Sequence, residues 1–461
     1  MPENSGSIVI GGIVPHPPIM VPEVGGREAG KVRRTQEALL ELGRRIRRSG
    51  AETMVMISPH GPVMWDAVAV VTQAHPQGNL GRFGAPEAVF ELDTDLVLAS
   101  LLREELKTGG IPEVEMRHRF DYQLDHGVTA PLYWLQKGGV DLPVVICGMA
   151  IMQLRRLYGF GLAAQRAAAA AGRKVAVVAS GDLSHRLSPE APNGYDPMGA
   201  VFDEKVQEIV AAADPLALVR LDPVLIECAG ECGLRPIVML FGAFDGRRVE
   251  AEVLSYEAPF GVGYMVASLL PGDRAQERLF AGKMAEDAKA QDEAKSYLVR
   301  LAERAIEAYL DHGEKIRVRD IPPEFARRAG VFVCLKKGGL LRGCIGTVEP
   351  TQANIAEEVV ENAISAATRD SRFDPVSPAE VADLTIAVDV LGEPEAVSGL
   401  EDLDPKRYGV IVSRGSRRGL LLPDLEGIDA PEQQVSIARR KAGIDPDEPV
   451  KLERFEVKRY Y

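Results

Sequence analysis

The chain has 461 residues, 46% of them hydrophobic and 26% charged; this composition is ordinary for a globular protein, and the length favours two domains. A formal net charge of −13 argues against nucleic acid as the main partner, because binding to phosphates needs a basic surface. No apolar run reaches the roughly 20 residues that span a bilayer, and five cysteines without a C-x-x-C pair fit a reducing cytoplasm, so we expect a cytoplasmic protein that does not bind membranes.

Short apolar runs alternate with helical patterns over residues 7–270. We predict strands at the β-branched or apolar runs 7–14, 53–57, 67–71, 142–147, 175–180, 249–256 and 261–269. We predict helices where apolar residues recur at helical spacing or alanine dominates, at 31–48, 95–107, 129–135 and 154–171. A turn-rich segment at 78–86 is expected to be a loop. This alternation is typical of an α/β domain with a mostly parallel sheet flanked by helices.

The pattern changes at Pro271. Residues 271–292 are charged and alanine-rich and predict a linker, and residues 293–461 then form a second, smaller domain. Its predicted elements are helices at 294–310 and 354–368, strands at 330–335, 340–345 and 384–390, and a loop-rich tail. The segment Lys336-Lys337-Gly338-Gly339 predicts the turn of a hairpin. This order indicates an α+β fold with antiparallel strand pairs.

Four of the seven histidines stand where a predicted strand ends or a predicted helix begins. Their contexts are Pro15-His16-Pro17-Pro18, Ser58-Pro59-His60-Gly61, Asp125-His126-Gly127 and Gly181-Asp182-Leu183-Ser184-His185. Ligands of α/β sheets bind outside the carboxyl ends of the strands, and consecutive strands are often neighbours. We therefore expect His16 and His60 to lie together, where a carboxylate would complete a facial triad for non-haem Fe(II). The alternative is that each histidine is an isolated loop residue.

As an ordered set, these motifs resemble those of class III extradiol ring-cleavage dioxygenases (LigB-like) and of the related Memo proteins. The resemblance implies His16 and His60 as iron ligands at one edge of the sheet, with His126 and His185 as acid/base residues. Extradiol cleavage needs a catechol bound to Fe(II), a base for a phenolic proton and an acid for ring opening. His185, oriented by Asp182, fits the base. The positive end of a helix disfavours the cationic form of His126, which would then hydrogen-bond oxygen or substrate.

The third metal ligand is open between two adjacent residues. Ring-cleaving relatives use a glutamate from this part of the chain, for which Glu231 is the candidate and Glu227, a helix-surface position, a weaker one. Memo-like relatives carry a cysteine in a Cys-Gly-x-x-Pro-Ile context, which Cys232 matches. Neighbouring residues point in different directions, so both do not hold one ion. Glu231 indicates Fe(II) oxygenase chemistry and Cys232 a softer site for copper or zinc; we favour Glu231.

The second domain carries Leu341-Arg342-Gly343-Cys344-Ile345-Gly346, which together with residues 365–376 resembles the AMMECR-type domain. From the residues alone, Cys344 could be a nucleophile whose thiolate fraction Arg342 raises, although cysteines in apolar strands are usually packing residues. The arginines of these two segments form either an anion pocket or ion pairs with Asp370 and Asp374, which is the commoner outcome. They are Arg342, Arg369 and Arg372.

The two domains together resemble the AmmeMemoRadiSam system protein A family, which implies a radical-SAM protein as partner. Two functions follow. The first is an Fe(II)-dependent extradiol-type dioxygenase that acts on a small catechol-like aromatic. The second is a Memo-like metal-binding protein, holding iron or copper, that serves as a redox or modification partner without cleaving rings. Cys232 and the fusion favour the second, whereas the two additional histidines favour the first. A homo-oligomer is left open.

Overall fold

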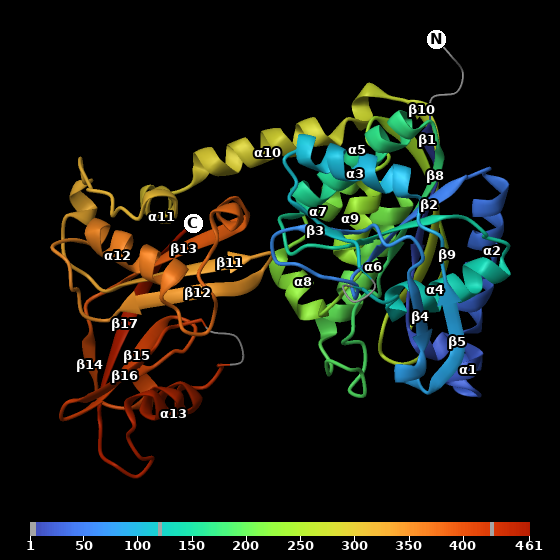
Figure 1. Cartoon of the computed structure of the whole chain (residues 1–461). Coiled ribbons are helices and arrows are strands. Elements are labelled where there is room, and N and C mark those ends of the chain that lie inside the picture. Colours follow the sequence, from blue (N-terminus) through green and yellow to red (C-terminus); the bar gives the residue numbers. More distant parts are fainter. Residues whose placement is uncertain (1–5, 119–121, 425–427) are drawn as a thin grey trace. The chain divides into compact units, whose positions relative to one another are not determined.

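The structure is a computed structural model that describes residues 6–118, 122–424 and 428–461 (Figure 1). The chain divides into two compact units, Met1–Lys289 and Ala290–Tyr461. Within the described residues, no helix combines the length and the apolar character that crossing a bilayer requires.

The first unit is built on an eight-stranded sheet with the order β6-β3-β7-β2-β8-β1-β10-β9. Its strands are β1 (Ser7–Val14), β2 (Thr53–Ser58), β3 (Val68–Val71), β6 (Glu113–Met116), β7 (Val144–Gly148), β8 (Lys174–Ser180), β9 (Arg247–Glu257) and β10 (Tyr264–Arg274). Strands β7, β2, β8 and β1 run parallel to one another, and β3 runs parallel to β6. Strand β3 is antiparallel to β7, and β10 is antiparallel to both β1 and β9. The predicted α/β class is confirmed, with a mixed sheet.

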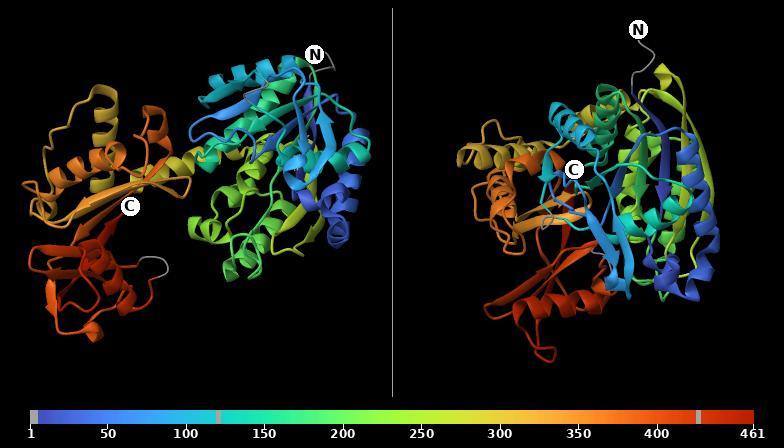
Figure 2. Two further views of the ribbon diagram at one scale, coloured as in Figure 1. Left: turned by 60° about the horizontal axis from the view of Figure 1, so that its bottom comes forward. Right: turned by 45° about the vertical axis from the view of Figure 1, so that its right-hand side comes forward.

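Helices cover both faces of this sheet (Figures 1 and 2). Both faces need covering because alternate side chains of the strands are apolar on both sides. In β2, Met54 and Met56 enter one hydrophobic core, and Val55 and Ile57 enter the other. The first core is closed by α2 (Arg33–Arg48) and α4 (His126–Lys137). The second is closed by α3 (Leu96–Thr108), α5 (Leu154–Ala171), α6 (Pro197–Ala211), α7 (Pro215–Val219), α8 (Pro223–Ala229) and α9 (Leu234–Gly242). The short helix α1 (Pro22–Gly25) and a hairpin of β4 (Gln77–Leu80) and β5 (Ala85–Glu91) complete the unit.

Three parallel strands end at one edge of the sheet. Val14 pairs with Ser180, and Ile57 pairs with Ala179, so β1, β2 and β8 finish at the same level. Prolines directly after β1 and β2 end those strands, because proline cannot donate to the ladder. Helix α4 begins next to this edge, where Ser180 Oγ donates a hydrogen bond to the carbonyl of Gly127 at 2.6 Å. The segments that carry the four histidines therefore meet at one place.

The second unit is an antiparallel seven-stranded sheet with the order β12-β11-β13-β17-β15-β16 and β14 beside β17, which confirms the predicted α+β class. Its strands are β11 (Val331–Lys337), β12 (Leu340–Thr347), β13 (Leu384–Leu391), β14 (Glu395–Val397), β15 (Tyr408–Arg414), β16 (Arg417–Leu421) and β17 (Lys451–Tyr460). Helices α11 (Tyr297–His312) and α12 (Ile355–Thr368) pack on one face of β11 and β13, and α13 (Pro431–Ala442) packs on β15 and β16. The predicted hairpin turn is present: Gly338 and Gly339 have φ of 56° and 87°, as a type I′ turn requires.

Three stretches differ from the predictions. Residues 271–292, predicted as a linker, continue β10 to Arg274 and then form most of α10 (Phe280–Ala294), whose Phe280 and Met284 join the core of the first unit. The segment at 78–86 belongs to the β4–β5 hairpin. The tail predicted as loop-rich contains α13 and four strands, β14 to β17. Its longest strand, β17, was missed because most of its side chains are charged and only Phe455 is fully buried, so it lacks an apolar pattern.

Candidate metal centre

Three imidazoles gather at the shared edge of the sheet. The Nε2 atoms of His16 and His60 are 2.9 Å apart. The ring of His126 stacks on that of His60, with centroids 4.3 Å apart and planes 26° from parallel. One ring nitrogen from each of the three residues lies within 4.8 Å of the others. The pair predicted from the sequence is therefore brought together, and His126, which was predicted as an acid/base residue, lies close enough to be a ligand as well.

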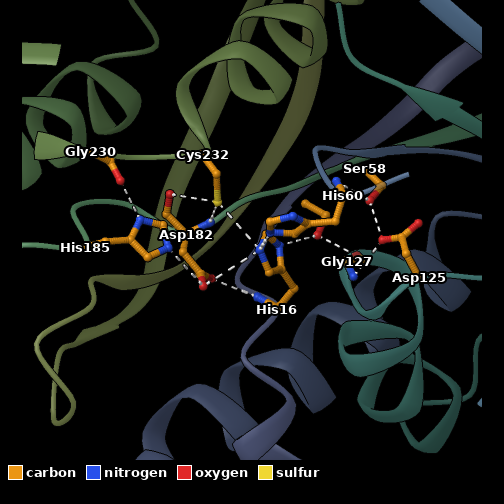
Figure 3. A network of polar contacts seen from close by, with 10 residues as sticks. His16, Ser58, His60, Asp125, Gly127, Asp182, His185, Gly230 and Cys232 are labelled. Atoms are coloured by element: carbon orange, nitrogen blue, oxygen red, sulfur yellow. Dashed lines mark hydrogen bonds and ion pairs between the residues drawn. The ribbon is translucent and has the colours of Figure 1, made fainter. Parts of the chain in front are cut away.

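Cys232 approaches His16 from the loop just before α9. Its Sγ atom lies 3.5 Å from Nε2 of His16 and accepts a hydrogen bond from the backbone N–H of Asp182 at 3.3 Å (Figure 3). Metal–nitrogen bonds of about 2.0–2.1 Å at angles of about 90–110° separate two nitrogens by about 2.9–3.4 Å. With a metal–sulfur bond of about 2.3 Å, the sulfur–nitrogen separation becomes about 3.1–3.6 Å. The His16–His60 and His16–Cys232 separations thus each fit two ligands of one ion, whereas the group whose donor atoms all lie within 4.8 Å of one another is His16, His60 and His126.

Ser180 sets the tautomer of His16. The Ser180 hydroxyl donates its only proton to the carbonyl of Gly127, so at 2.9 Å it accepts from Nδ1–H of His16. In the neutral ring the proton is then on Nδ1, and the lone pair of Nε2 faces His60 and Cys232. Burial, with a contribution from His60, lowers the pKa of His16 well below its usual value. The ring is therefore held neutral and oriented as a metal ligand would be.

Asp182 lies between His16 and His185. One carboxylate oxygen accepts from the backbone N–H of His16 at 2.9 Å, and the other is 3.8 Å from Nε2 of His16 and 4.0 Å from Nε2 of His185 (Figure 3). Burial raises the pKa of Asp182 to about 7. His185 was predicted to be oriented by this carboxylate, but its Nδ1–H donates to the carbonyl of Gly230 at 2.8 Å. Gly230 thus sets the ring, and the free nitrogen of neutral His185 faces Asp182.

Asp125 holds His126 in place. Its carboxylate caps α4 by accepting from the N–H of Gly127 at 2.8 Å and from the hydroxyl of Ser58 at 2.7 Å. The hydroxyl of Tyr122 donates to its other oxygen at 2.8 Å. Burial is the main cause that lowers the pKa of His126, which favours the neutral ring, whereas the sequence-based expectation rests on the helix dipole. Ser58 and Ser180 are not predicted as site residues; their signal in the sequence is a hydroxyl at the end of an apolar strand.

Glu231, the favoured third ligand, is engaged elsewhere. One carboxylate oxygen accepts from the N–H of Leu234 at 2.6 Å, at the start of α9, and the other lies 3.9 Å from Arg235 Nη1. The side chain is 2% exposed. Because adjacent side chains point in different directions, the chain can direct only one of the two candidates at His16, and the one directed there is Cys232. The geometry does not support our preference for Glu231.

In the second unit, Arg342 and Cys344 lie on opposite faces of β12. The register with β11 shifts by one residue at a β-bulge, which turns Arg342 toward the helix-covered face. There both Nε and Nη2 of Arg342 donate to Glu380 at 3.0 Å, and the buried Lys337 binds the same carboxylate at 3.3 Å. Arg342 is therefore not placed to activate the thiol of Cys344.

The other two arginines of the predicted anion pocket are also paired. Arg372 binds Asp370 at 2.6 Å, and Arg369 lies 3.2 Å from Glu361. Of the two alternatives left open by the sequence, the structure shows ion pairs, although Asp374 contributes only its carbonyl, which accepts from Arg342 at 2.8 Å.

The first unit is thus an α/β domain with a histidine-rich group that could hold a metal ion at the carboxyl edge of its parallel strands. Residues 12–267 match the family model described as the catalytic LigB subunit of aromatic ring-opening dioxygenase, and residues 299–460 match the AMMECR1 model. The chain belongs to the LigB family, with an AMMECR1 domain fused after the LigB domain.

Relatives show the same organisation or parts of it. The protein CA_C1420 of Clostridium acetobutylicum is 37% identical over 97% of this chain and 98% of its own length. A Thermotoga maritima protein is 54% identical over 35% of this chain and 95% of its own length. Among solved structures, the uncharacterized protein PH0010 of Pyrococcus horikoshii is 36% identical, with 36% of this chain and 90% of that chain covered and a TM-score of 0.34. The uncharacterized protein JW3007 of Escherichia coli K12 is 18% identical, with 57% and 99% covered and a TM-score of 0.41.

Proposed function

We propose that the LigB domain binds copper through His16, His60 and Cys232 and acts as a Memo-like redox or modification partner that does not cleave aromatic rings. One observation carries this proposal. Nε2 of His16, which faces His60, lies 3.5 Å from the thiol of Cys232, whereas the carboxylate of Glu231 is bound elsewhere. Two imidazoles with a thiolate form a softer donor set than two imidazoles with a carboxylate, and thiolates favour copper or zinc over Fe(II).

When bound, copper would supply one-electron redox chemistry. The protein's own residues prepare the site for it. Ser180 keeps the coordinating nitrogen of His16 unprotonated, and the exposed ring of His60 leaves the site open to solvent. Asp182, whose pKa burial raises to about 7, can hold or release a proton 4.0 Å from Nε2 of His185. Because 4.0 Å is longer than a hydrogen bond, a proton would pass between Asp182 and His185 through one bridging water or after a closer approach of the two groups.

The partner belongs to the same proposal. We infer a radical-SAM protein as the partner, with the AMMECR1 domain serving as a docking or substrate-recognition module. The support is the resemblance of the fused LigB and AMMECR1 domains to the AmmeMemoRadiSam system protein A family, which implies such a partner.

A second candidate function is extradiol cleavage of a catechol-like aromatic with Fe(II) as cofactor. The observation that favours it is that His126 stacks on His60 and that His185 lies 4.0 Å from Asp182, while burial lowers the pKa of both histidines. In this candidate, the free Nε2 of His185 would accept a phenolic proton from the substrate. His126, stacked on His60, would hydrogen-bond oxygen or the ring's substituents. Ring-cleavage chemistry needs both kinds of group, and copper binding alone does not explain them.

One experiment separates the candidates. The full chain is purified without oxygen, loaded separately with Cu(I), Zn(II) and Fe(II), and assayed for metal stoichiometry and for oxygen uptake with a panel of catechols. The first proposal predicts tight stoichiometric copper and no catechol-dependent oxygen uptake with any metal. Catechol-dependent uptake by the iron-loaded protein, with ring-opened product, would replace it by the second candidate. If none of the three ions binds stoichiometrically, both candidates are wrong.

A further inference from the structure

Two cysteines of the AMMECR1 domain face each other across neighbouring strands. Cys334 on β11 pairs in register with Cys344 on β12. The N–H of Cys344 donates to Asp370 at 2.9 Å, and its carbonyl accepts from Arg372 at 3.2 Å. A strand residue directs both backbone groups to one side, and among the described strands β12 is an edge strand that pairs with β11 alone. Because both groups of Cys344 point away from β11, the two cysteines form a non-hydrogen-bonded pair.

This position brings the two side chains as close as an antiparallel sheet allows. Non-hydrogen-bonded pairs have Cα atoms about 4.5 Å apart, and disulfides bridge Cα separations of about 4.4–6.8 Å. Both cysteines are free and half-buried, so a reagent in solution can reach them. Their side chains lie on the face of β11 opposite to Val333 and Leu335, which enter the core under α11 and α12. The pair is therefore not sealed inside the domain.

The two thiols are also chemically unequal. The proximity of the two thiols is the largest cause of both shifts: Cys344 lowers the pKa of Cys334, whereas Cys334, together with burial, raises the pKa of Cys344. Lys336, two residues along the same strand, further lowers the pKa of Cys334. The thiolate is the nucleophile in disulfide exchange, so Cys334 is the attacking residue and Cys344 is the second, resolving residue.

We propose that Cys334 and Cys344 are a thiol–disulfide exchange pair that closes reversibly into a cross-strand disulfide at the expense of a low-molecular-weight disulfide. The Cys334 thiolate attacks one sulfur of the small disulfide, forms a mixed disulfide and expels one small thiolate. The sulfur of Cys344, having lost its proton, then attacks the sulfur of Cys334 and expels the second. The protein loses two electrons and two protons, and the small disulfide gains them as two thiols. This site is independent of the metal centre and of the function proposed for it.

The test uses the full chain and oxidised glutathione. After incubation, free thiols are blocked with an alkylating agent under native conditions, and the protein is digested with trypsin. Cleavage at Lys336 and Arg342 separates the two cysteines into peptides 329–336 and 343–369. We expect these peptides to appear joined, lighter by two hydrogens than their sum, with the loss of two of the five free thiols. Dithiothreitol should restore both peptides.

Variants give the controls. Cys344→Ser should trap glutathione on Cys334, because no second thiol can release it, whereas Cys334→Ser should leave Cys344 unmodified. Cys228→Ser, a half-buried cysteine of the LigB domain, should leave the joined peptides unchanged. Far-UV circular dichroism checks that each variant folds. The proposal is wrong if wild-type protein shows only separate alkylated peptides or only glutathione adducts at any ratio of oxidised to reduced glutathione.

Discussion

The Sγ atom of Cys232 and the Nε2 atom of His16 lie 3.5 Å apart, although 216 positions separate the two residues in the chain. This contact joins the loop before α9 to the loop after β1 and places Cys232, rather than the adjacent Glu231, beside His16. It also gives the most direct prediction. Cys232→Ser should weaken copper binding at least about tenfold. Removal of a residue that only hydrogen-bonds to a metal ligand already costs about that much, and the loss of a ligand should cost no less.

Glu231→Gln is the matched control for that variant. It changes the neighbouring residue but preserves an oxygen that can accept from the N–H of Leu234. Metal content should stay at the wild-type level, as measured by mass spectrometry of the metal after gel filtration. If Glu231→Gln loses the metal and Cys232→Ser keeps it, the third ligand is Glu231 and not Cys232.

His16→Ala and His60→Ala should each abolish metal binding without unfolding the protein. His60 is exposed, so its loss uncovers no core. His16 is only 2% exposed, but its partner Ser180 would keep the hydrogen bond to the carbonyl of Gly127 after the substitution. Neither change therefore removes a large part of the core. Metal stoichiometry and far-UV circular dichroism are measured together. Full metal occupancy in both folded variants would contradict the ligand assignment.

Ser180→Ala tests the tautomer argument. Without the hydroxyl, Nδ1–H of His16 loses its acceptor, and the ring can place its proton on Nε2 instead. Metal affinity should fall about 10–100-fold, as is typical when a partner behind a ligating histidine is removed. Ser184→Ala is the control, because its buried hydroxyl donates to the carbonyl of Ala229 and accepts from the N–H of Arg186 rather than from a histidine. Equal losses in competition titrations of the two variants would show a general packing effect.

The Arg342–Glu380 pair predicts a pH-dependent stability of the second unit. Burial raises the pKa of Glu380, but hydrogen bonds from Arg342 and Ser377 and the charge of Lys337 outweigh it and lower the pKa to about 2. Since the folded-state pKa lies below the unfolded value of about 4.3, the stabilisation is present above that pH and is lost as the pH falls toward 2. Glu380→Gln should cost roughly 3–5 kcal/mol at pH 7, because it leaves buried cations unpaired. The difference from wild type should shrink below about pH 4.3.

Urea unfolding at several pH values measures this effect. Both tryptophans, Trp65 and Trp134, lie in the first unit, so their fluorescence reports that unit while circular dichroism reports both. The fluorescence transition should not change. Glu361→Gln, which removes a partly exposed partner of Lys315 and Arg369, should cost no more than about 1 kcal/mol. A cost for Glu380→Gln that does not vary between pH 7 and pH 3 would contradict the pKa argument.

The sequence by itself determined the local elements with strong periodicity and where they end. β1, α5 and the turn at Gly338 and Gly339 were predicted because a short β-branched run, an alanine-rich run and paired glycines each restrict the backbone locally. The prolines beside His16 and His60 marked strand ends in the same way. Because ends of parallel strands meet at one edge, the proximity of these two histidines followed from the pattern.

The tertiary structure alone decided which way side chains face. Glu231 and Cys232 differ by one position, and only the start of α9 turns the thiol toward His16 and the carboxylate toward its own helix. A single bulge sends Arg342 to the face opposite Cys344. Strand β17 escaped prediction because its neighbours, and not its own sequence, hold it in the sheet. Backbone periodicity is a local property, whereas side-chain direction depends on register and on contacts between residues far apart in the chain.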